Sequence, residues 1–529
     1  MKILLLHPHD IYSEKEPWTI RIVRLADEFA KKGHDVKLAY FAFGRIDKPG
    51  NFTCALGVEI IPLSRDISLL ALLKNIALIF KLAGWADIVH FQKCHHYAAV
   101  PALLASFFRG KPVHYDWDDW EEKIFYHSNK LTFSIAVIGC YFSFLERIVP
   151  LLVDTVSVSS EKLRKLTMDL GVPAQRIVMA PVGADLAQFN PQVSGQKIKD
   201  KYSKDLPLVL YLGQLHGGQY AELLINAAKS VLDNNLSANF MIVGGGSRLA
   251  ELKSLAASLG IEKNVIFTDT VAHEVIPQYI AASSVCVACF EDNEITNCKS
   301  PLKIAEYLAS GKAIIASNVG EVRNMVGGAG LLVEPGNSVA LAGGIIKLLN
   351  NDVLRLEMGA RARVRAIRKY NWEKTAGNLL EAYNTALRLN NKPSNEILIP
   401  ARDFQRGNLN RQAHDFGVNL VIDGGTAPSF AEYDIYFPVE GKYELWIKYA
   451  TQVYRPCQIY INNRLFCLEG MPETTGGWSM EHAAWFKQFQ LDMPAGIHTL
   501  KLSSENVFSH LACIEFKKIT SGSGMPEFC

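Results

Sequence analysis

Short apolar segments alternate with amphipathic helical patterns from the start of the chain to about residue 390. Each apolar segment has the length of a buried strand, and the first is followed by Ile22, Leu25 and Phe29 at helical spacing. This alternation predicts strand–helix–strand units and a parallel sheet covered on both faces. The first series of predicted strands comprises Lys2–Leu6, Asp35–Phe41, Ile88–Phe91, Pro112–Asp116 and Thr155–Ser159.

A second series of strands and helices follows the segment Pro181–Asp185, which marks the passage between two lobes. Two Rossmann-like lobes bind ligands at the carboxyl ends of their strands, in the cleft between the lobes. The second series of predicted strands comprises Leu208–Leu212, Asn239–Val243, Val265–Thr268, Val285–Cys289, Ala313–Ala316 and Gly330–Val333.

The pattern changes after residue 390. From Ile397 to Lys518, short alternating segments separated by turn residues predict an all-β sandwich. The predicted fold class is therefore α/β, with two Rossmann-like lobes followed by an all-β jelly-roll-type sandwich. The predicted domains are 1–185, 186–390 and 397–518, joined by a linker at Asn391–Asn395 and followed by a flexible tail at 519–529.

Charge and cysteine content restrict the kind of partner. Lys and Arg number 55 against 53 Asp and Glu, so no broad positive field favours a nucleic acid. The ten cysteines lack a regular spacing, which is typical of reduced thiols in a cytoplasm. Cys286 and Cys289 lie three residues apart on a predicted strand, so we expect a structural role and not a metal site. The run Met1–His7 is too short for a secretory segment and is predicted to be the first strand.

One uncharged segment raises the question of membrane contact. Leu131–Leu145 carries no charge and ends at Glu146 and Arg147. Because a spanning helix needs about twenty residues, a buried helix is the favoured interpretation and a helix lying on the membrane surface is the alternative. The apolar run Leu69–Ile79, interrupted by Lys74, leaves the same choice open.

The stretch Ser300–Ser317 combines a helix start, a carboxylate and a strand. Pro301 at the first helical position and Gly311 just beyond the end predict a short helix, and Ala313–Ala316 predicts a buried strand. Glu306 lies in the middle of that helix. Since exposed glutamates are common on helices, spacing alone leaves Glu306 either solvated or part of a ligand site.

This stretch resembles the donor site of retaining glycosyltransferases of the GT-B fold, family 4, and the resemblance covers roughly residues 1–390. It implies that Glu306 accepts hydrogen bonds from the donor ribose and that backbone N–H groups at the helix start face the phosphates or the sugar. The first Glu of the family's E-x7-E pattern is replaced by Cys298. The implied donor residues of this stretch are Ser300, Pro301, Leu302, Lys303 and Glu306.

The family normally has an Arg and a Lys that clamp the diphosphate after the first strand of the second lobe. Gln214 and Gln219 stand in place of both cations here. A neutral amide cannot offset the charge of a leaving diphosphate, so Lys303, His216 or helix dipoles would have to do so. The resemblance implies further donor contacts at Gly213, Gln214, Gln219, Gly244 and Gly245.

The first lobe has a run of carboxylates, Asp116, Asp118 and Asp119, at the place where the family often has His-Asp after a strand. Asp118 replaces the His and Asp119 keeps the acid. Carboxylates at a strand end predict contact with the acceptor or the transferred sugar, and a solvated helix-capping role is the alternative. His7 and Trp18 are expected to line the acceptor side. Asp118, Asp119 and Lys303 are the predicted catalytic residues.

The C-terminal sandwich resembles carbohydrate-binding modules of the galactose-binding-like type, family 6 or 35, in Ala431–Ile435, Gly441–Tyr443 and Thr475–Trp478. Trp478 and Trp485 lie in or just after a glycine-rich loop, where aromatic rings can stack on sugars. Each is either a glycan-binding or a core-capping residue on the sequence alone. Trp446, which lies on a predicted strand, is expected to be a packing residue.

These resemblances together imply a retaining hexosyltransferase-type enzyme. It would move a sugar from a nucleotide-diphosphate sugar to a glycan or glycolipid acceptor, in polysaccharide biosynthesis. No metal or other cofactor is expected, because fixed donors can stabilise the leaving group. The expected partners are the nucleotide sugar and a glycan or lipid-linked oligosaccharide, without nucleic acid, at a location that is cytoplasmic or peripheral at the inner face of the membrane. The alternative, motivated by Gln214, Gln219 and Cys298, is a catalytically decayed glycan-binding protein.

Overall fold

The computed structural model describes residues 1–12, 19–42, 57–66, 68–128, 132–203, 206–216, 220–391, 396–411, 416–417, 420–422 and 425–519. Contacts divide the chain into two units. The first comprises residues 1–170 and 178–384 and carries two parallel sheets. The second comprises residues 171–177 and 385–529 and carries two antiparallel sheets. The core of the predicted linker, residues 392–395, and residues 520–529 of the predicted tail lie outside the described residues.

The first sheet has the order β3-β2-β1-β4-β5-β6-β7. All five expected strands are present, with β1 paired in parallel to both β2 and β4. Sequence reasoning missed β3 and β7 at the two edges, since the side chains of both are mostly only partly buried and their apolar patterns are weak. The strands are β1 (Lys2–His7), β2 (Asp35–Ala42), β3 (Val58–Ser64), β4 (Ile88–Gln92), β5 (Val113–Trp117), β6 (Thr155–Val158) and β7 (Ile177–Met179).

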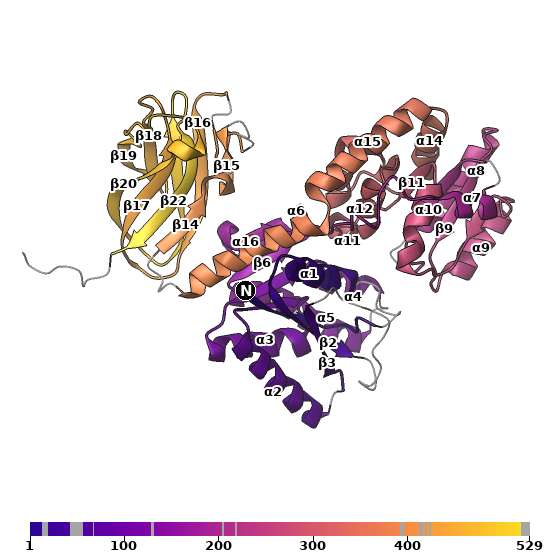
Figure 1. Ribbon diagram of the computed structural model, residues 1–529, viewed down its shortest axis with the longest axis horizontal. Helices are drawn as coiled ribbons and strands as arrows, with labels where there is room; N and C mark the ends of the chain where they lie inside the picture. Colours follow the sequence, from indigo (N-terminus) through magenta and orange to yellow (C-terminus); the bar gives the residue numbers. More distant parts are fainter. Residues whose placement is uncertain are drawn as a thin grey trace, which may run out of the picture. The chain divides into compact units, whose positions relative to one another are not determined.

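Helices accompany this first sheet, as Figure 1 shows in indigo and purple. The sequence reflects their packing: α1 buries Ile22, Leu25 and Phe29 at helical spacing. The helices are α1 (Ile20–Lys31), α2 (Leu69–Trp85), α3 (His96–Arg109), α4 (Glu121–Ser128), α5 (Phe133–Leu152) and α6 (Glu161–Asp169).

The second sheet has the order β10-β9-β8-β11-β12-β13, with parallel pairing throughout. Its six strands were all expected. They are β8 (Leu208–Leu212), β9 (Asn239–Val243), β10 (Val265–Phe267), β11 (Val285–Ala288), β12 (Ile314–Ser317) and β13 (Gly330–Val333). The helices are α7 (Gln196–Tyr202), α8 (Ala221–Asp233), α9 (Leu249–Ser258), α10 (Ile276–Ala282), α11 (Glu294–Cys298), α12 (Leu302–Ala309), α13 (Gly320–Val326), α14 (Ser338–Leu349) and α15 (Asp352–Lys369).

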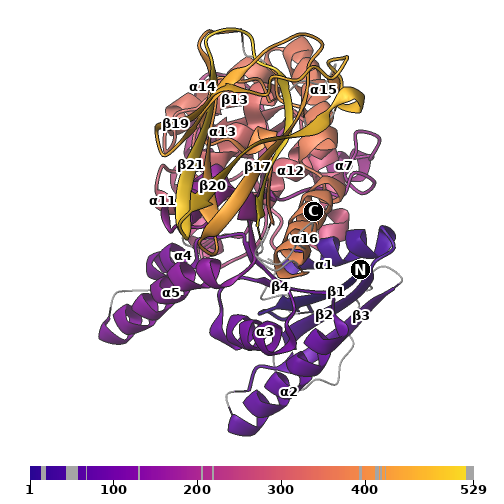
Figure 2. The ribbon, with the colours of Figure 1, turned by 90° about the vertical axis from the view of Figure 1, so that its left-hand side faces the viewer.

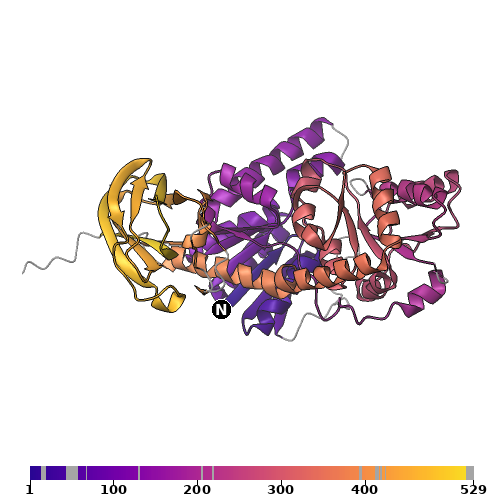
Figure 3. The same ribbon diagram turned by 90° about the horizontal axis from the view of Figure 1, so that it is seen from above.

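The helix α16 (Trp372–Asn391) returns from the second lobe to the first. The hydroxyl of Tyr383 lies 2.7 Å from Nδ1 of His90 on β4, and Asn378 donates to the carbonyl of Met179 on β7. Figure 3 shows this orange helix running along the purple first lobe. The two parallel sheets and this crossing helix make the first unit a GT-B fold.

The second unit contains the expected β-sandwich. One sheet has the order β14-β22-β17-β20 and the other β15-β16-β21-β18-β19, and alternate residues such as Tyr443, Leu445 and Ile447 form the core. The strands are β14 (Glu396–Pro400), β15 (Arg406–Gly407), β16 (Ser429–Phe437), β17 (Gly441–Ala450), β18 (Cys457–Ile461), β19 (Arg464–Gly470), β20 (Ala484–Met493), β21 (Gly496–Ser504) and β22 (His510–Lys518).

The expectation of a buried helix after residue 131 is wrong. Helix α5 is largely exposed: Phe133 is 86% and Phe144 60% accessible, and only 28% of the segment Ile135–Leu152 is buried. Its neighbours cover the side that carries Leu145 and Val149 and leave the rest open. Within the described residues, α5 is the one helix long and apolar enough to cross a membrane.

Candidate active site

Helix α12 places Glu306 in the interior of the second lobe. Pro301 caps the helix, and Gly311 just beyond its end has a φ of 63°, a left-handed conformation that glycine adopts readily. Glu306 is only 2% exposed, so the solvated interpretation is wrong. A carboxylate at this depth needs a partner, and Nε2 of His273 lies 2.6 Å from its Oε1.

His273 is a site residue that sequence reasoning missed. It begins the short 3-10 helix η3 (His273–Val275) after β10. Burial lowers the pKa of its imidazole, but the hydrogen bond and charge of Glu306 outweigh burial and raise the pKa overall. His273 orients the carboxylate of Glu306 through its contact with Oε1. Among the described residues, none donates a hydrogen bond to Oε2. A single histidine in a turn has no distinguishing pattern, so only the tertiary contact identifies it.

Lys303, one turn before Glu306, has a buried ammonium group without a hydrogen-bond partner among the described residues. Its Nζ lies 4.2 Å from the centre of the Tyr211 ring, a cation–π contact that offsets only part of the cost of burial. Burial lowers the pKa of Lys303 to about 8. A buried, unpaired cation is costly and rare, so the arrangement indicates a place for an anion.

Two strand-end loops meet beside this ammonium group. A Cβ at Gly213 would lie 2.8 Å from Nζ of Lys303, and a Cβ at Gly244 would lie 2.0 Å from the carbonyl oxygen of Gly213. Both glycines have positive φ, 153° and 141°. Only glycine permits this approach of backbone to backbone and to Lys303. Gly245 follows directly, so the structure brings the predicted Gly213, Gly244 and Gly245 together with Lys303.

The replacements of the expected phosphate clamp are only partly described. Oε1 of Gln214 lies 2.8 Å from Nε2 of His216. Gln219 lies outside the described residues, together with Gly217 and Gly218. Gln214 is therefore placed close to the Gly213 loop, while the position of Gln219 stays a prediction.

The loop before α12 connects the second lobe to the segment between the lobes. The hydroxyl of Ser300 accepts a hydrogen bond from the N–H of Val182 at 3.3 Å, and Pro301 and Leu302 are half-buried beside it. Burial raises the pKa of Cys298 to about 12, and the charges of Lys162 and Asp119 of the first lobe also act on this thiol. The loop before α12 thus contacts the segment between the lobes through Ser300 and Val182.

Asp116 differs from the sequence interpretation, which grouped it with the functional carboxylates. It is fully buried at the end of β5 and accepts two hydrogen bonds from Arg21, at 2.7 and 2.8 Å, and one from Ser157 at 2.6 Å. Burial raises the pKa of Asp116, but the charge and hydrogen bonds of Arg21 outweigh it and lower the pKa overall. Asp116 is therefore part of a structural ion pair in the core of the first lobe.

Removing one member of this pair is expected to be strongly destabilising. Arg21→Met leaves the carboxylate of Asp116 buried without a counter-charge, which costs about 3–5 kcal/mol of unfolding free energy. Urea denaturation at neutral pH measures this loss. The double variant Arg21→Met with Asp116→Leu should recover most of the loss, because no charge remains buried. Equal losses in the single and the double variant would contradict a structural ion pair.

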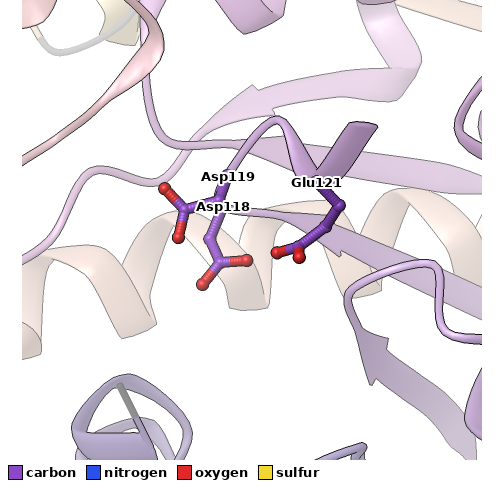
Figure 4. Close-up of side chains that lie close together, drawn as sticks. All are labelled: Asp118, Asp119 and Glu121. Carbon is purple, nitrogen blue, oxygen red and sulfur yellow. The ribbon is translucent and has the colours of Figure 1, made fainter. Parts of the chain in front are cut away.

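Asp118 and Asp119 lie together with Glu121, and one carboxylate oxygen from each of the three lies within 4.8 Å of the other two. Figure 4 shows Asp118 and Glu121 turning their carboxylates toward each other, with Asp119 beside them. Three carboxylates are ligands that suit Mg²⁺. However, Nζ of Lys93 lies 3.4 Å from both Asp118 and Asp119 and contacts Glu121. An ammonium group already supplies the positive charge, so the arrangement does not fit a metal ion.

Asp118 is a carboxyl of this cluster with a raised pKa. Burial raises its pKa to about 6, with Lys93 acting in the opposite direction and Asp119 in the same direction. Its Oδ2 accepts a hydrogen bond from Nε2 of Gln92 at 2.5 Å, and Oε1 of Gln92 lies 2.9 Å from Nδ1 of His7. The structure therefore connects the predicted His7 and Asp118 through Gln92.

Trp18, the other residue predicted on the acceptor side, lies outside the described residues. Lys93 and Gln92 were not singled out by sequence reasoning. Lys93 has a φ of 63°, unusual for a residue with a side chain, and directly follows β4. From this position the side chain of Lys93 reaches the carboxylates that follow the neighbouring strand β5. The two segments become neighbours only when β4 and β5 pair in the sheet.

The sandwich places Trp478 within a set of side-chain contacts. Its indole N–H donates to Oε1 of Gln452 at 3.1 Å, and the guanidinium of Arg455 lies 4.1 Å from the centre of the ring. The imidazole of His510 packs 5.0 Å from the same ring. Much of the indole is therefore engaged by the protein, and sugar binding by Trp478 stays a prediction.

Trp446 does not pack in the core, contrary to the sequence interpretation. It lies on the outer side of β17 with Glu444 and Lys448, while the residues between them are buried. Lys448 pairs in register with Trp485 of β20, and Trp446 pairs with Lys487, so the two tryptophans are diagonal neighbours on one face. Trp485 is 36% exposed. The alternation of strand β17 decides which way Trp446 faces.

Comparison with known families bears on both lobes of the first unit. Residues 19–183 match the model described as Glycosyl transferase 4-like domain, and residues 206–351 match the model described as Glycosyl transferases group 1. The two lobes are therefore glycosyl transferase domains, the first of the 4-like kind and the second of group 1. Asp118 and Asp119 fall within the first matched domain, and Lys303 and Glu306 within the second. The sandwich lies beyond both matched segments.

Curated relatives of these glycosyl transferase domains align with part of the chain. D-inositol 3-phosphate glycosyltransferase of Nocardia farcinica is 31% identical over 246 residues, which is 44% of this chain and 52% of that protein. Alpha-D-kanosaminyltransferase of Streptomyces kanamyceticus is 24% identical over 217 residues, which is 40% of this chain and 55% of that protein. The alignments therefore span about half the length of these relatives.

Solved structures agree on the fold of the glycosyl transferase domains. HepE from Anabaena, solved in complex with UDP and glucose, has a TM-score of 0.57 at 18% identity and covers 73% of this chain and 99% of that chain. Sucrose-phosphate synthase from Thermosynechococcus elongatus has a TM-score of 0.55 at 18% identity, with coverages of 73% and 98%. At this identity the likeness concerns the fold, which is GT-B.

Proposed function

We propose that this chain is a retaining glycosyltransferase that moves a sugar from a nucleotide-diphosphate sugar to a hydroxyl of a glycan or lipid-linked oligosaccharide. The observation that carries the proposal is the buried, unpaired ammonium of Lys303, three residues from the buried carboxylate of Glu306. The ammonium group of Lys303 suits a diphosphate, and the carboxylate of Glu306 suits a ribose diol. The matched family and the UDP bound in HepE support the same assignment.

The donor would be held by groups of known position. Oε2 of Glu306 would accept a hydrogen bond from the ribose hydroxyls while His273 holds Oε1. Lys303 would bind the diphosphate. The N–H groups of Gly213 and Gly244 donate to the carbonyls of Val243 and Asp269, so any backbone donors would come from the residues that follow these glycines. In the reaction, the bond from the anomeric carbon to the diphosphate oxygen breaks and a bond to the acceptor oxygen forms on the same face. The acceptor proton passes to the leaving phosphate, so no protein nucleophile is needed.

The first lobe would position the acceptor and the transferred sugar. Asp118 and Asp119 would accept hydrogen bonds from sugar hydroxyls. The positive charge of Lys93 offsets the repulsion between their two carboxylates. The expected contribution of the enzyme is orientation and electrostatic stabilisation without a metal ion. The poor fit of the Lys93 cluster to a metal supports that expectation.

The alternative of a decayed glycan-binding protein rests on Gln214, Gln219 and Cys298. It would leave the buried charge of Lys303 without any purpose, although an unpaired ammonium is costly to keep. Reaction at the cytoplasmic side of a membrane, in polysaccharide biosynthesis, completes the proposal. It agrees with free thiols such as Cys286 and Cys298 among the described residues.

Titration calorimetry with UDP, GDP, ADP, dTDP and CMP, without metal, tests the proposal. We expect saturable binding of one nucleoside diphosphate and, with the matching sugar donor, transfer to an acceptor glycan with the anomeric configuration kept. Binding of none of the five would reject the transferase. Nucleotide binding without hydrolysis or transfer from any sugar derivative would favour the decayed protein.

We further propose that the sandwich holds a glycan on the face that carries Trp446 and Trp485. The indole N–H of Trp446 donates to Glu444 at 3.1 Å, and Gln490 also donates to Glu444 at 2.9 Å. Aromatic rings beside fixed hydrogen-bonding groups suit sugars, which present C–H faces and hydroxyl edges. This proposal names a sheet face as the binding surface, where the sequence suggested a loop.

Trp446→Ala and Trp485→Ala are each expected to weaken binding of an oligosaccharide acceptor about tenfold, since a lost stacking contact costs about 1–1.5 kcal/mol. Calorimetry or tryptophan fluorescence with the acceptor series measures the effect. Nucleotide affinity should not change, because both residues belong to the second unit. Loss of acceptor binding in Trp478→Ala alone would instead assign the site to the glycine-rich loop.

A further inference from the structure

Exposed apolar side chains concentrate on three helices of the first lobe. Of the thirty-three large apolar residues exposed in the described part of the chain, fourteen lie on α2, α3 and α5. We call these fourteen residues the apolar face. They are Leu70, Leu72, Leu73, Val100, Leu104, Phe107, Phe108, Phe133, Val137, Ile138, Tyr141, Phe144, Leu151 and Leu152.

The three helices that carry the apolar face are neighbours, because α3 contacts both of the others. The ring of Phe108 lies 6.1 Å from that of Phe80 on α2, and the ring of His96 lies 5.6 Å from that of Tyr141 on α5. Figure 2 shows α5 at the left of the purple lobe, with α3 and then α2 below it. Apolar patches of this extent on a soluble protein mark an interaction site.

Each helix exposes its apolar residues as a stripe. On α2 the exposed positions include Leu70, Leu73 and Ala77, spaced by three and four residues. On α3 the stripe ends in Phe107 and Phe108, which are 80% and 68% exposed. A large phenylalanine left this open gains nothing from folding, so the stripe is expected to be covered in the working state of the protein.

The exposed charges on the three helices of the apolar face are all positive. Helices α2 and α3 contain no Asp or Glu, and Lys74, Lys81 and Arg109 are exposed on them. The acid of α5, Glu146, is turned inward: it accepts hydrogen bonds from the indole of Trp117 at 3.1 Å and from the N–H of Glu122 at 2.9 Å. The neighbouring Arg147 is exposed.

We infer that the apolar face docks on a membrane surface rich in anionic lipid. Exposed Phe and Leu residues insert among the acyl chains while Lys and Arg meet lipid headgroups, the pattern of interfacial helices. Helix α5 lies on the surface and does not span it, because Glu146 is held inside the lobe and Leu145 and Val149 are buried in it. The inference is independent of the transferase proposal and adds to it a surface on which a lipid-borne acceptor would arrive.

Vesicle sedimentation tests the inference. The probes are vesicles of phosphatidylcholine alone and of phosphatidylcholine with about 30 mol % phosphatidylglycerol. We expect the intact chain to bind the vesicles that contain phosphatidylglycerol at least tenfold more tightly than the vesicles of phosphatidylcholine alone. Leu73→Glu with Phe107→Glu should weaken that binding at least tenfold, and Lys74→Gln with Lys81→Gln should reduce the preference for anionic lipid.

The matched control is Val339→Glu with Leu468→Glu, which changes equally exposed apolar residues on α14 and β19 and should bind vesicles like the unchanged chain. Circular dichroism and thermal unfolding confirm that each variant is folded, and nucleotide binding is measured separately on the same samples. No vesicle binding by the folded unchanged chain overturns the inference. So does a dimer in light scattering that the Leu73→Glu with Phe107→Glu variant converts to a monomer without any vesicle binding, since a second copy then covers the face.

Discussion

Lys303→Met is expected to lower the rate of sugar transfer by about two to three orders of magnitude, the effect of removing a preorganised group that stabilises developing charge in an enclosed site. Its Nζ lies against Gly213 and has no partner among the described residues, so it is available to a leaving diphosphate. Gln214 supplies no charge to compensate. The measurement is kcat/KM for the donor, followed by release of the nucleoside diphosphate.

The same residue predicts a pH dependence of nucleotide binding. Burial lowers the pKa of Lys303 to about 8, so the unliganded protein carries the charge below pH 8 and loses it above. Affinity for the nucleoside diphosphate should therefore fall as the pH rises through 8, whereas affinity for the nucleoside should stay level. This dependence of the diphosphate affinity on pH should vanish in Lys303→Met. An identical slope in both proteins would show that another group binds the phosphates.

The free energy of unfolding should rise with pH over the range in which the nucleotide affinity falls. An unfolded lysine keeps its proton to about pH 10.5, so the folded state opposes the charged form and gains stability between pH 8 and pH 10.5. One pKa unit corresponds to about 1.4 kcal/mol, so the buried charge costs on the order of 3 kcal/mol at pH 7. Lys303→Met should raise Tm at pH 7, and the gain should shrink above pH 8. Lys347→Met, on the exposed side of α14, is the control and should change neither Tm nor activity.

Glu306→Gln is expected to weaken nucleotide binding about a hundredfold. A hydrogen bond to an ionised carboxylate contributes about 1.5–3 kcal/mol, and the buried position of Glu306 excludes water that could replace it. The variant also removes the charge that His273 faces at 2.6 Å, so the pKa of His273 should fall below its ordinary value, because burial is then no longer opposed by the charge of Glu306. Calorimetry gives the affinity, and NMR titration of the imidazole gives the pKa.

A ribose analogue makes the Glu306 prediction specific. The unchanged protein should bind the 2′-deoxynucleotide much more weakly than the ribonucleotide, and Glu306→Gln should bind both alike, because the contact that distinguishes them is gone. Glu357→Gln on the exposed side of α15 is the control and should preserve the difference. If Glu306→Gln keeps full discrimination, the ribose is bound elsewhere.

Much of the fold could be predicted because it depends on local patterns. The period of apolar residues and the glycine and proline signals at element ends decide where strands and helices form. All six strands of the second sheet, the helix that carries Glu306 and the change to a β-sandwich near residue 397 followed from such patterns. Weak edge strands such as β3 were missed, since their side chains are only partly buried.

The contents of the site depended on contacts between distant segments. His273 meets Glu306, Lys93 meets Asp118 and Asp119, and Arg21 meets Asp116 only after the sheets form. A sequence shows which residue types are available at a strand end but not which side chain from another segment will neutralise them. This is why Asp116 was misread as functional.

The sequence by itself therefore determined the layers of this protein and the kind of residue at each strand end. The tertiary structure alone decided which charges are paired, which remain open to a ligand, and which apolar surfaces are left uncovered, as on α5. The physical reason is range: helix and strand periodicity acts over a few residues, whereas burial and charge pairing depend on which faces meet across the whole domain.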